Sequence, residues 1–171
     1  RSSLCHKNGM GFLEPPPNFA MVAPGVYRSA FPSVRNLPFL AHLKLRAILC
    51  LCPETYPDNN QTFLAKAHIE LMQFGVEGNK EPADEIPHHI VVDALRAILD
   101  QTNRPLLIHC NMGKHRTGCF VGCLRRVQNW SLVSILDEYR LYTGDKARLP
   151  DELFIECFSV PRDLAQLEFE S

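Results

Sequence analysis

Residues 106–118 read Leu-Leu-Ile-His-Cys-Asn-Met-Gly-Lys-His-Arg-Thr-Gly, and this stretch decides the fold that the sequence predicts. Its first four residues form an apolar run without helical periodicity, which is typical of a buried strand. A polar, glycine-containing loop over 110–115 follows directly, and a helix is predicted over 116–129. Because ligands of open α/β sheets bind beyond the carboxyl ends of the strands, this loop stands where a ligand would bind.

The rest of the chain continues the alternation of strands and helices. Further strands are predicted at 19–22, 26–29, 46–52 and 69–74, the first two forming a hairpin. The predicted helices, with their capping residues, are 34–43 (Ser33), 60–68 (Asp58 or Asn59), 88–101, 132–142 (Ser131) and a short one that opens at Pro150. This pattern indicates an α/β fold with a mostly parallel central sheet and helices on both faces.

Length and composition point to one globular domain with its own core. The chain has 171 residues, of which 46% are hydrophobic and 22% are charged, close to globular averages. Its apolar runs are only a few residues long, so no membrane span is expected. The net charge of −1 predicts no general affinity for nucleic acid, and an anionic ligand would need a local basic patch. We expect an extended lead-in at 1–18, a single domain at 19–158 and a C-terminal tail at 159–171.

The cysteine residues favour a reducing compartment. There are seven of them, an odd number, and their spacing does not resemble a secreted disulfide framework. We therefore expect mostly buried free thiols and a cytoplasmic location. The chain begins at Arg1 rather than at a methionine, from which we expect a trimmed N-terminus.

Cys110 and Arg116 are separated by five residues, and this spacing suits anion chemistry. A five-residue loop between a strand and a helix can curl so that successive N–H groups form a nest for an anion, reinforced by the helix dipole. Gly113 permits a positive φ in the curl, and the planar fork of Arg116 matches two phosphate oxygens. The same positive surroundings favour the thiolate of Cys110, a nucleophile that faces the bound anion.

The spacing Cys-x5-Arg occurs a second time, between Cys119 and Arg125. This second match lies inside the predicted helix, with no strand before it and no room for a loop. Cys119 and Cys123 are four residues apart on that helix, which favours core thiols. We therefore expect anion chemistry at the first match only.

A metal site is the alternative interpretation of the cysteine and histidine residues. His109, Cys110 and His115 could be ligands, but zinc needs four ligands, or three and a water, at compatible spacings. Cys50 and Cys52 alternate along a predicted strand, where we expect core packing. The sequence predicts neither a metal nor another cofactor.

A longer pattern accompanies the His-Cys-x5-Arg-Thr-Gly segment. It includes Pro-Asn-Phe-Ala-Met-Val (17–22), Gly-Val-Tyr-Arg-Ser (25–29), Leu-Cys-Pro-Glu (51–54), Gly-Asn-Lys-Glu-Pro (78–82), Gly-Lys-His-Arg-Thr-Gly-Cys (113–119), Gln-Asn-Trp (128–130), Asp-Glu-Tyr (137–139) and Lys-Ala-Arg (146–148). The loop resembles that of cysteine-dependent protein-tyrosine and dual-specificity phosphatases. Over about residues 15–158 the chain resembles the plant and fungal atypical dual-specificity phosphatases that hydrolyse inositol pyrophosphates, which implies the fold of these phosphatases.

The resemblance implies a reaction in two steps. Cys110 attacks the terminal phosphoryl group and forms a phosphocysteine, while Arg116 and the loop amides stabilise the equatorial oxygens. Water then hydrolyses the intermediate. Thr117 is expected to donate its hydroxyl to the sulfur of Cys110, and His109 to hold the loop through backbone hydrogen bonds.

The resemblance also implies an acid and a set of substrate contacts. A general acid is expected on the loop 75–87, where Asp84 is the first choice among Glu77, Glu81, Asp84 and Glu85. The expected substrate-binding residues are Asn111, Met112, Gly113, Lys114, His115, Lys80, Lys146, Arg148 and Arg28. The positions of Asn111 and Met112 are commonly basic in that family, so their neutral side chains predict a lower affinity for the most highly charged substrates.

Several functions stay open at this point. The favoured one is a phosphatase for inositol pyrophosphates, with a small polyanion as substrate. A protein-tyrosine, dual-specificity or phosphoinositide phosphatase is the alternative, so that a phosphoprotein is a further candidate partner. A non-catalytic phosphate-binding module is less favoured because Cys110 and Arg116 are both present. Arg-Thr-Gly at 116–118 fits a phosphatase loop better than that of a sulfurtransferase or arsenate reductase.

Overall fold

The computed structural model of the chain describes residues 13–77 and 86–166. Within these ranges five strands form one sheet in the order β1-β2-β5-β3-β4. The strands are β1 (Ala20–Ala23), β2 (Val26–Ser29), β3 (Ala47–Cys50), β4 (Glu70–Gln73) and β5 (Leu106–His109). The β1–β2 hairpin is antiparallel, and the other three pairings of this sheet are parallel.

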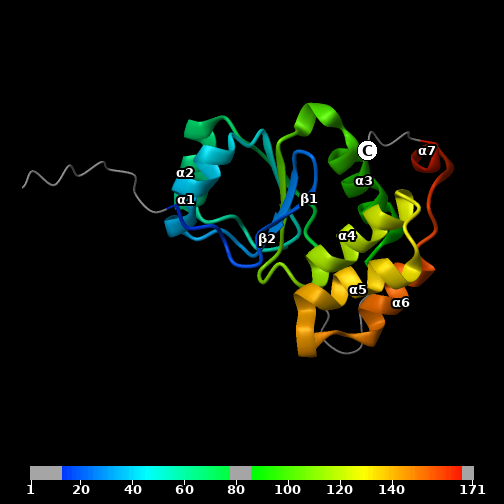
Figure 1. The fold of residues 1–171 in the computed structure, drawn as a ribbon. Coiled ribbons are helices and arrows are strands. Elements are labelled where there is room, and N and C mark those ends of the chain that lie inside the picture. Colours follow the sequence, from blue (N-terminus) through cyan, green and yellow to red (C-terminus); the bar gives the residue numbers. More distant parts are fainter. Residues whose placement is uncertain (1–12, 78–85, 167–171) are drawn as a thin grey trace, which may run out of the picture.

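Helices cover both faces of the sheet, as predicted (Figure 1). Helices α1 (Leu37–Leu43) and α2 (Asp58–Ala67) lie on one side. On the other side lie α3 (His88–Leu99), α4 (His115–Val127), α5 (Leu132–Thr143) and α6 (Leu149–Cys157), with α7 (Arg162–Ala165) at its edge. Short 3-10 turns are η1 (Val34–Asn36), η2 (Gln101–Asn103) and η3 (Gly144–Lys146). None of the helices in the described ranges has the length and apolar character needed to cross a bilayer.

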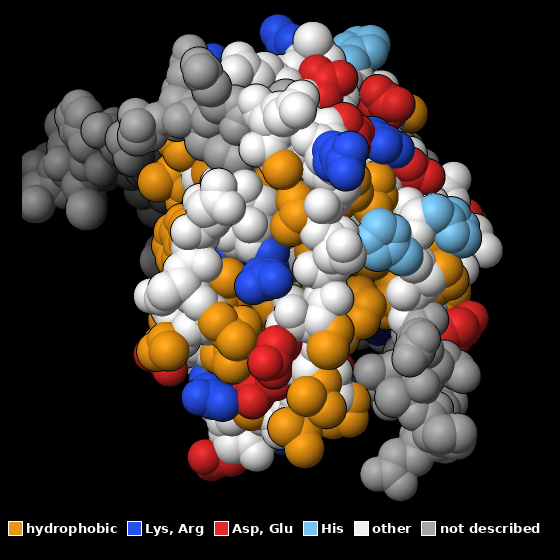
Figure 2. Space-filling model, turned by 90° about the vertical axis from the view of Figure 1, so that its right-hand side faces the viewer, with side chains coloured by type: hydrophobic (Ala, Val, Ile, Leu, Met, Phe, Trp, Pro, Cys, Tyr) orange, Lys and Arg blue, Asp and Glu red, His pale blue; other side chains and the backbone are white. Residues whose placement is uncertain are grey.

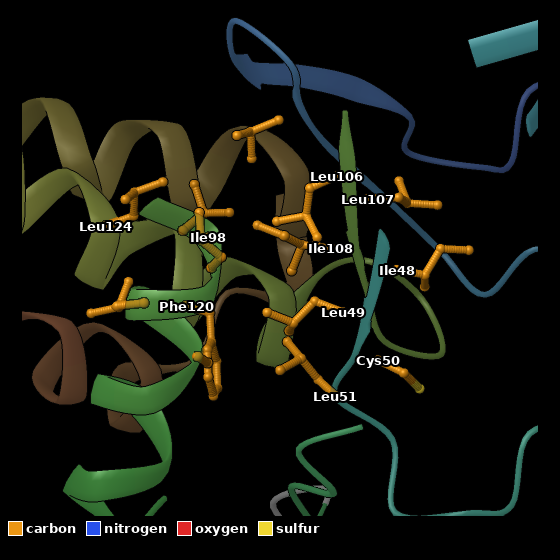
Figure 3. Packing of buried hydrophobic residues seen from close by; sticks show 14 of the residues in the cluster. Ile48, Leu49, Cys50, Leu51, Ile98, Leu106, Leu107, Ile108, Phe120 and Leu124 are labelled. Atoms are coloured by element: carbon orange, nitrogen blue, oxygen red, sulfur yellow. The ribbon is translucent and has the colours of Figure 1, made fainter. Parts of the chain in front are cut away.

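The central strands β3 and β5 are buried along their whole length. Side chains of successive strand residues point to opposite faces, so each of these strands packs on both helical layers. Figure 3 shows Leu49 and Ile108 on the side of Ile98 and Phe120, and Ile48 and Leu107 on the opposite side. Burying each such side chain contributes roughly 1.5–3 kcal/mol, which explains why these runs are almost entirely apolar.

The strand register brings three strand ends to one edge of the sheet. Ser29 of β2 pairs with His109 of β5, and His109 pairs with Cys50 of β3. The segment after His109 therefore emerges between the ends of two neighbouring strands. This is the place where the sequence predicts a ligand-binding loop.

The predicted elements differ from the observed ones mainly at their ends. Helix α2 begins at Asp58 with Pro57 as its N-cap, so the prediction of Asp58 or Asn59 as the cap was wrong. Helix α3 ends at Leu99, because the Asp100 carboxylate accepts a hydrogen bond from the backbone N–H of Thr102 and starts η2. Ser33 caps η1, which continues into α1, and Ser131 caps α5, both as predicted.

Helix α7 lies within the segment predicted as a tail, and the sequence pattern did not predict it. Its Leu164 is buried and belongs to the main hydrophobic cluster.

Figure 2 shows the outer helical face of the molecule, where Lys and Arg side chains are scattered among acidic and hydrophobic ones. The described residues of that face therefore form no continuous basic surface.

Candidate active site

The loop between β5 and α4 forms the floor of a pocket. Cys110 is the first residue after β5, and Arg116 lies in the first turn of α4. The pocket has a volume of about 290 Å³ and is lined by Glu77, Ile86, Cys110, Asn111, Met112, His115, Arg116, Cys119, Arg148 and Asp151. The structure thus brings Cys110 and Arg116 to one cavity, as predicted from their spacing.

Every backbone carbonyl from Cys110 to Lys114 faces a hydrogen-bonding group outside the pocket. The contacts are Cys110 O with His109 Nδ1 (3.4 Å), Asn111 O with Phe31 N (3.0 Å), Met112 O with Asn18 Nδ2 (2.8 Å), Gly113 O with Arg28 Nη2 (2.9 Å) and Lys114 O with Gly118 N (2.7 Å). In a trans peptide the N–H group points opposite to the carbonyl. The outward carbonyls therefore turn successive N–H groups inward, the arrangement that binds an anion.

Gly113 is required by both backbone geometry and space. Its φ is +67°, in the left-handed region that favours glycine. A Cβ at this position would lie 2.4 Å from the carbonyl carbon of Ser29. The loop therefore packs directly on the end of β2, and the positive φ predicted for Gly113 is confirmed.

The guanidinium of Arg116 is held at the pocket by backbone carbonyls of neighbouring segments. Its Nη1 donates to Val76 O at 2.9 Å and to Leu51 O at 3.4 Å. Leu51 follows the end of β3 and Val76 follows the end of β4, so the arginine is oriented by carbonyls that come just after two strands. Both contacts use a single nitrogen of the fork.

Arg28 supports the loop and does not line the pocket. Its side chain is 1% exposed, donates to the carbonyl of Gly113 and stacks over the ring of Tyr142 at 3.6 Å. Its Nε and Nη1 have no hydrogen-bond partner among the described residues, and burial lowers the pKa of its guanidinium. The expectation of direct substrate contact at Arg28 is therefore replaced by a role beneath the loop.

His109 lies fully buried behind the loop. Its Nδ1 faces the carbonyl of Cys110, and its Nε2 lies 3.2 Å from the hydroxyl of Tyr56. The edge of the ring packs against Phe31, with ring centroids 4.8 Å apart. Burial lowers the pKa of His109 to about 4, so the ring is neutral near pH 7. This geometry agrees with the predicted contact between the ring and the loop backbone.

Thr117 is buried in the first turn of α4. Its hydroxyl has no hydrogen-bond partner within the described part of the chain. Buried hydroxyls are normally paired, so a partner that arrives during the reaction would satisfy this group. The predicted hydrogen bond from Thr117 to the sulfur of Cys110 stays a prediction.

His115 faces a buried carboxylate on the pocket wall. Its Nδ1 lies 2.9 Å from Asp151 Oδ2 and 3.2 Å from the hydroxyl of Tyr139. The Tyr139 hydroxyl donates to the same carboxylate oxygen at 2.6 Å. His115 was predicted as a substrate contact, whereas the sequence pattern marks Asp151 only as part of a helix start.

Some of the remaining predicted contact residues line the pocket, and others do not. Asn111, Met112 and Arg148 are exposed and line it. Lys114 is half-buried, Lys146 is exposed on η3, and neither belongs to the lining residues. Lys80 and Asp84 lie outside the described residues, so their predicted roles are carried forward as proposals.

Two further groups of residues bear on metal binding and on the second Cys-x5-Arg match. Cys50, Cys52 and His109 place one donor atom each within 4.8 Å of one another, but both ring nitrogens of His109 already face Tyr56 and Cys110. A metal there would have to displace one of these contacts and find a fourth ligand.

At the second Cys-x5-Arg match, burial raises the pKa of the Cys119 thiol, and Arg125 donates twice to Glu138 at 2.8 Å.

No role was assigned from the sequence to two residues that shape the loop, Phe31 and Asn18, although Asn18 lies in the quoted segment 17–22. Asn18 has a φ of +56°, a conformation that asparagine tolerates better than most residues, and it follows three prolines. That turn signal could have drawn attention to it. Phe31 acts through its backbone N–H, which leaves no signal in the identity of its side chain.

Comparison with known proteins shows which family the chain belongs to. The chain is 55% identical over 152 residues to inositol diphosphatase DSP1 of Oryza sativa subsp. japonica, covering 89% of this chain and 68% of that protein. It is 52% identical over 145 residues to inositol diphosphatase SIW14 of Saccharomyces cerevisiae, covering 84% and 52%. The solved Siw14 catalytic core is 49% identical, with a TM-score of 0.84 over 87% of this chain and 89% of that one. Because residues 13–168 also match the tyrosine phosphatase family, the chain belongs to that family.

Proposed function

We propose that the protein is a cysteine-dependent phosphatase that removes the terminal phosphate of inositol pyrophosphates. The observation that carries the proposal is the loop after β5, whose carbonyls all face outward around Cys110 while Arg116 reaches the same pocket. The relatives named inositol diphosphatase, at 42–55% identity over most of the chain, support this choice of substrate.

In the proposed first step, the Cys110 thiolate attacks the terminal phosphorus and forms a P–S bond. The bond from that phosphorus to the bridging oxygen breaks, and the shorter inositol phosphate leaves. The inward N–H groups and the fork of Arg116 meet the three equatorial oxygens, where negative charge gathers in the transition state. To do so, Arg116 uses the fork nitrogens that its contacts with Val76 and Leu51 leave available.

In the second step, water attacks phosphorus, the P–S bond breaks, and the electron pair returns to the sulfur. We propose that the hydroxyl of Thr117 then donates to this sulfur, since it is buried beside the loop and has no partner among the described residues. Inorganic phosphate leaves and the thiolate is restored.

The proposed substrate combines many negative charges with an easily released leaving group. Arg148 lines the pocket, and three further basic side chains are assigned to the substrate from the sequence: Lys114, Lys146 and Lys80. Together they would attract a compact polyanion, although the chain as a whole is slightly acidic. The neutral side chains of Asn111 and Met112 at the pocket lining would lower affinity for the most highly charged substrates. Asp84 is proposed as the acid for substrates that need a proton on the leaving oxygen.

Three coarser proposals accompany this one. A single phosphatase domain over 19–158 fits the one sheet and its shared core. A cytoplasmic location fits the free thiols of Cys50, Cys52, Cys110, Cys119, Cys123 and Cys157. With a net charge of −1, nucleic acid is not a proposed partner, and phosphoproteins are an alternative class of substrate.

The experiment that tests the function compares phosphate release from four substrates with one enzyme preparation. They are an inositol pyrophosphate, inositol hexakisphosphate, a phosphoinositide and a phosphotyrosine peptide. We expect the highest kcat/KM on the inositol pyrophosphate. A clearly higher kcat/KM on the peptide would support a protein phosphatase instead, and no turnover of any substrate would support a non-catalytic module.

A further inference from the structure

The pocket wall holds a histidine and a carboxylate that the two steps above do not use. His115 and Asp151 line the same pocket as Cys110, and the Asp151 side chain is only 2% exposed. Its Oδ2 receives two hydrogen bonds, from the Tyr139 hydroxyl at 2.6 Å and from His115 Nδ1 at 2.9 Å. A buried carboxylate that orients a pocket histidine is an arrangement found where enzymes move protons.

The hydrogen bonds assign the proton on the histidine ring. The Tyr139 hydroxyl accepts from the backbone N–H of Arg148 at 3.3 Å and gives its own proton to Asp151. As a carboxylate, Asp151 can only accept, so the proton in its hydrogen bond with His115 sits on Nδ1. In the neutral ring Nε2 then carries a lone pair, and no hydrogen bond to Nε2 occurs in the described ranges 13–77 and 86–166.

Burial, with help from neighbouring cations, lowers the pKa of His115 and so favours its neutral ring near pH 7. The groups that face it are Asp151 of α6, Tyr139 of α5, Arg148 at the start of α6 and the neighbouring Lys114, while the Cys119 thiol lies against Asp151. Burial lowers the pKa of His115 most, Arg148 and Lys114 lower it further, and Asp151 raises it. His115 lines the pocket, and a neutral imidazole with a lone pair on Nε2 can accept a proton.

We propose that His115, oriented by Asp151, is the general base that activates the water hydrolysing the phosphocysteine on Cys110. As water oxygen bonds to phosphorus, its proton moves to Nε2 of His115. The P–S bond breaks and its electron pair returns to the sulfur of Cys110. The imidazolium, stabilised by the Asp151 carboxylate, then gives its proton to solvent. This inference rests on the proposed function, because it needs the phosphocysteine intermediate.

The second step suits this pair of residues better than the first. In the first step a leaving inositol phosphate oxygen needs little protonation, and the neutral His115 has no proton on Nε2 to give. In the second step the attacking water must lose a proton, and a neutral imidazole can accept it. His115 is therefore the catalytic residue here, and Asp151 is a positioning residue that acts through it.

The test separates the two steps by rapid mixing with p-nitrophenyl phosphate, whose leaving group needs no acid. In His115→Gln we expect a burst of p-nitrophenol equal to the enzyme concentration, followed by a steady rate about 100-fold below that of the native protein. Acid quenching should trap phosphoenzyme in this variant. His42→Gln is the matched control, because His42 is exposed on α1, and it should keep the native rate.

Asp151→Asn tests the orienting role. Because Asp151 raises the pKa of His115, its replacement should move the acid limb of the kcat profile to lower pH, besides slowing phosphoenzyme hydrolysis. A purely structural role would change the melting temperature and leave that limb in place. If His115→Gln does not fold, the Asp151→Asn profile decides, and an unmoved acid limb overturns the inference.

The outcomes distinguish this inference from the proposed function. Turnover that survives in Cys110→Ser would overturn the function itself. If Cys110 is essential and His115→Gln shows no burst but a native steady rate, only the base is wrong. If His115→Gln loses the burst and the turnover together, His115 serves binding or the first step, and the inference is overturned as well.

Discussion

The segments that begin at Cys110 and at Cys119 share the spacing Cys-x5-Arg, yet they end in different environments. Cys110 follows a strand and opens a curled loop, whereas Cys119 lies inside α4. Gly113, between Cys110 and Arg116, has a φ of +67°, while the residues between Cys119 and Arg125 are helical. The spacing alone therefore does not make an anion site; the strand before it and the helix after it do.

The two arginines show the same difference. Within the described part of the chain, Arg116 donates to two backbone carbonyls, through one nitrogen, at a pocket. Arg125 is engaged by both oxygens of Glu138, by the Val22 carbonyl and by the ring of Trp130 at 4.0 Å. A guanidinium satisfied by a carboxylate has no fork to offer a phosphate. The second arginine is therefore structural.

The strongest test of this comparison replaces each of the two cysteines by serine in turn. Cys110→Ser should abolish turnover, because a serine hydroxyl is a far weaker nucleophile toward phosphorus than sulfur is. Cys119→Ser should keep most of the activity. Phosphate release measured at pH 7 decides, with melting temperatures as the check on folding. More than a few per cent of native activity in Cys110→Ser would remove this residue from the nucleophile role.

The arginines give the next largest contrast. Arg116→Lys should lose about 10²–10³-fold in kcat, close to Arg116→Ala, because lysine keeps the charge without the two-pronged geometry. Arg125→Lys should instead lower stability by about 2 kcal/mol through its broken contacts with Glu138 and Val22, with kcat nearly unchanged. A lysine at position 116 that works within tenfold of the native rate would show that charge alone suffices.

Glycine substitutions test the curl of the loop. In Gly113→Ala the new Cβ would overlap the backbone of Ser29, so we expect a loss of at least ~3 kcal/mol of stability, together with loss of activity. Gly144 has a φ of +56° and a ψ of −137°, but nothing lies within 4 Å of the position that a Cβ would take, so Gly144→Ala should cost about 1–3 kcal/mol, from backbone strain alone. Chemical denaturation of both variants provides the measurement, and equal losses would show that backbone conformation rather than contact with β2 matters.

The sequence predicts most of the fold, because the buried strands and amphipathic helices leave clear apolar patterns. The run 106–109 was located to the residue, since burial on both faces requires an unbroken apolar strand, whereas α4 begins at His115, one residue before its predicted start. Helix ends were less predictable: Asp58 lies inside α2 rather than capping it, because Pro57 takes the cap position. A helix of four residues such as α7 is too short to show a period.

Within the site, the sequence predicts the residues that carry chemistry better than those that hold them. The spacing of Cys110 and Arg116 is a local signal. The contacts of Asn18 and Phe31 with the loop join segments far apart in the chain, and they end on backbone groups that no pattern marks. Arg28 was assigned to the substrate because its charge was visible in the sequence and its burial was not.

The last comparison concerns pH, and it also separates the two segments. Buried His109 precedes Cys110, whereas Gly118 precedes Cys119 and cannot titrate. Because the pKa of His109 is lowered to about 4 in the folded protein, the unfolded chain takes up a proton below about pH 6.5 while the folded one does not. Stability should therefore be complete above about pH 6.5 and fall by about 2 kcal/mol between about pH 6.5 and pH 5, at about 1.4 kcal/mol per pH unit. Urea unfolding followed across this pH range measures the change in stability.

His115, whose pKa is also lowered, adds a loss of stability of the same sign, so His109→Gln should reduce the slope of stability against pH without removing it. A slope that is unchanged in His109→Gln would show that the ring of His109 is already charged in the folded protein, and that the loop is not held by a neutral histidine.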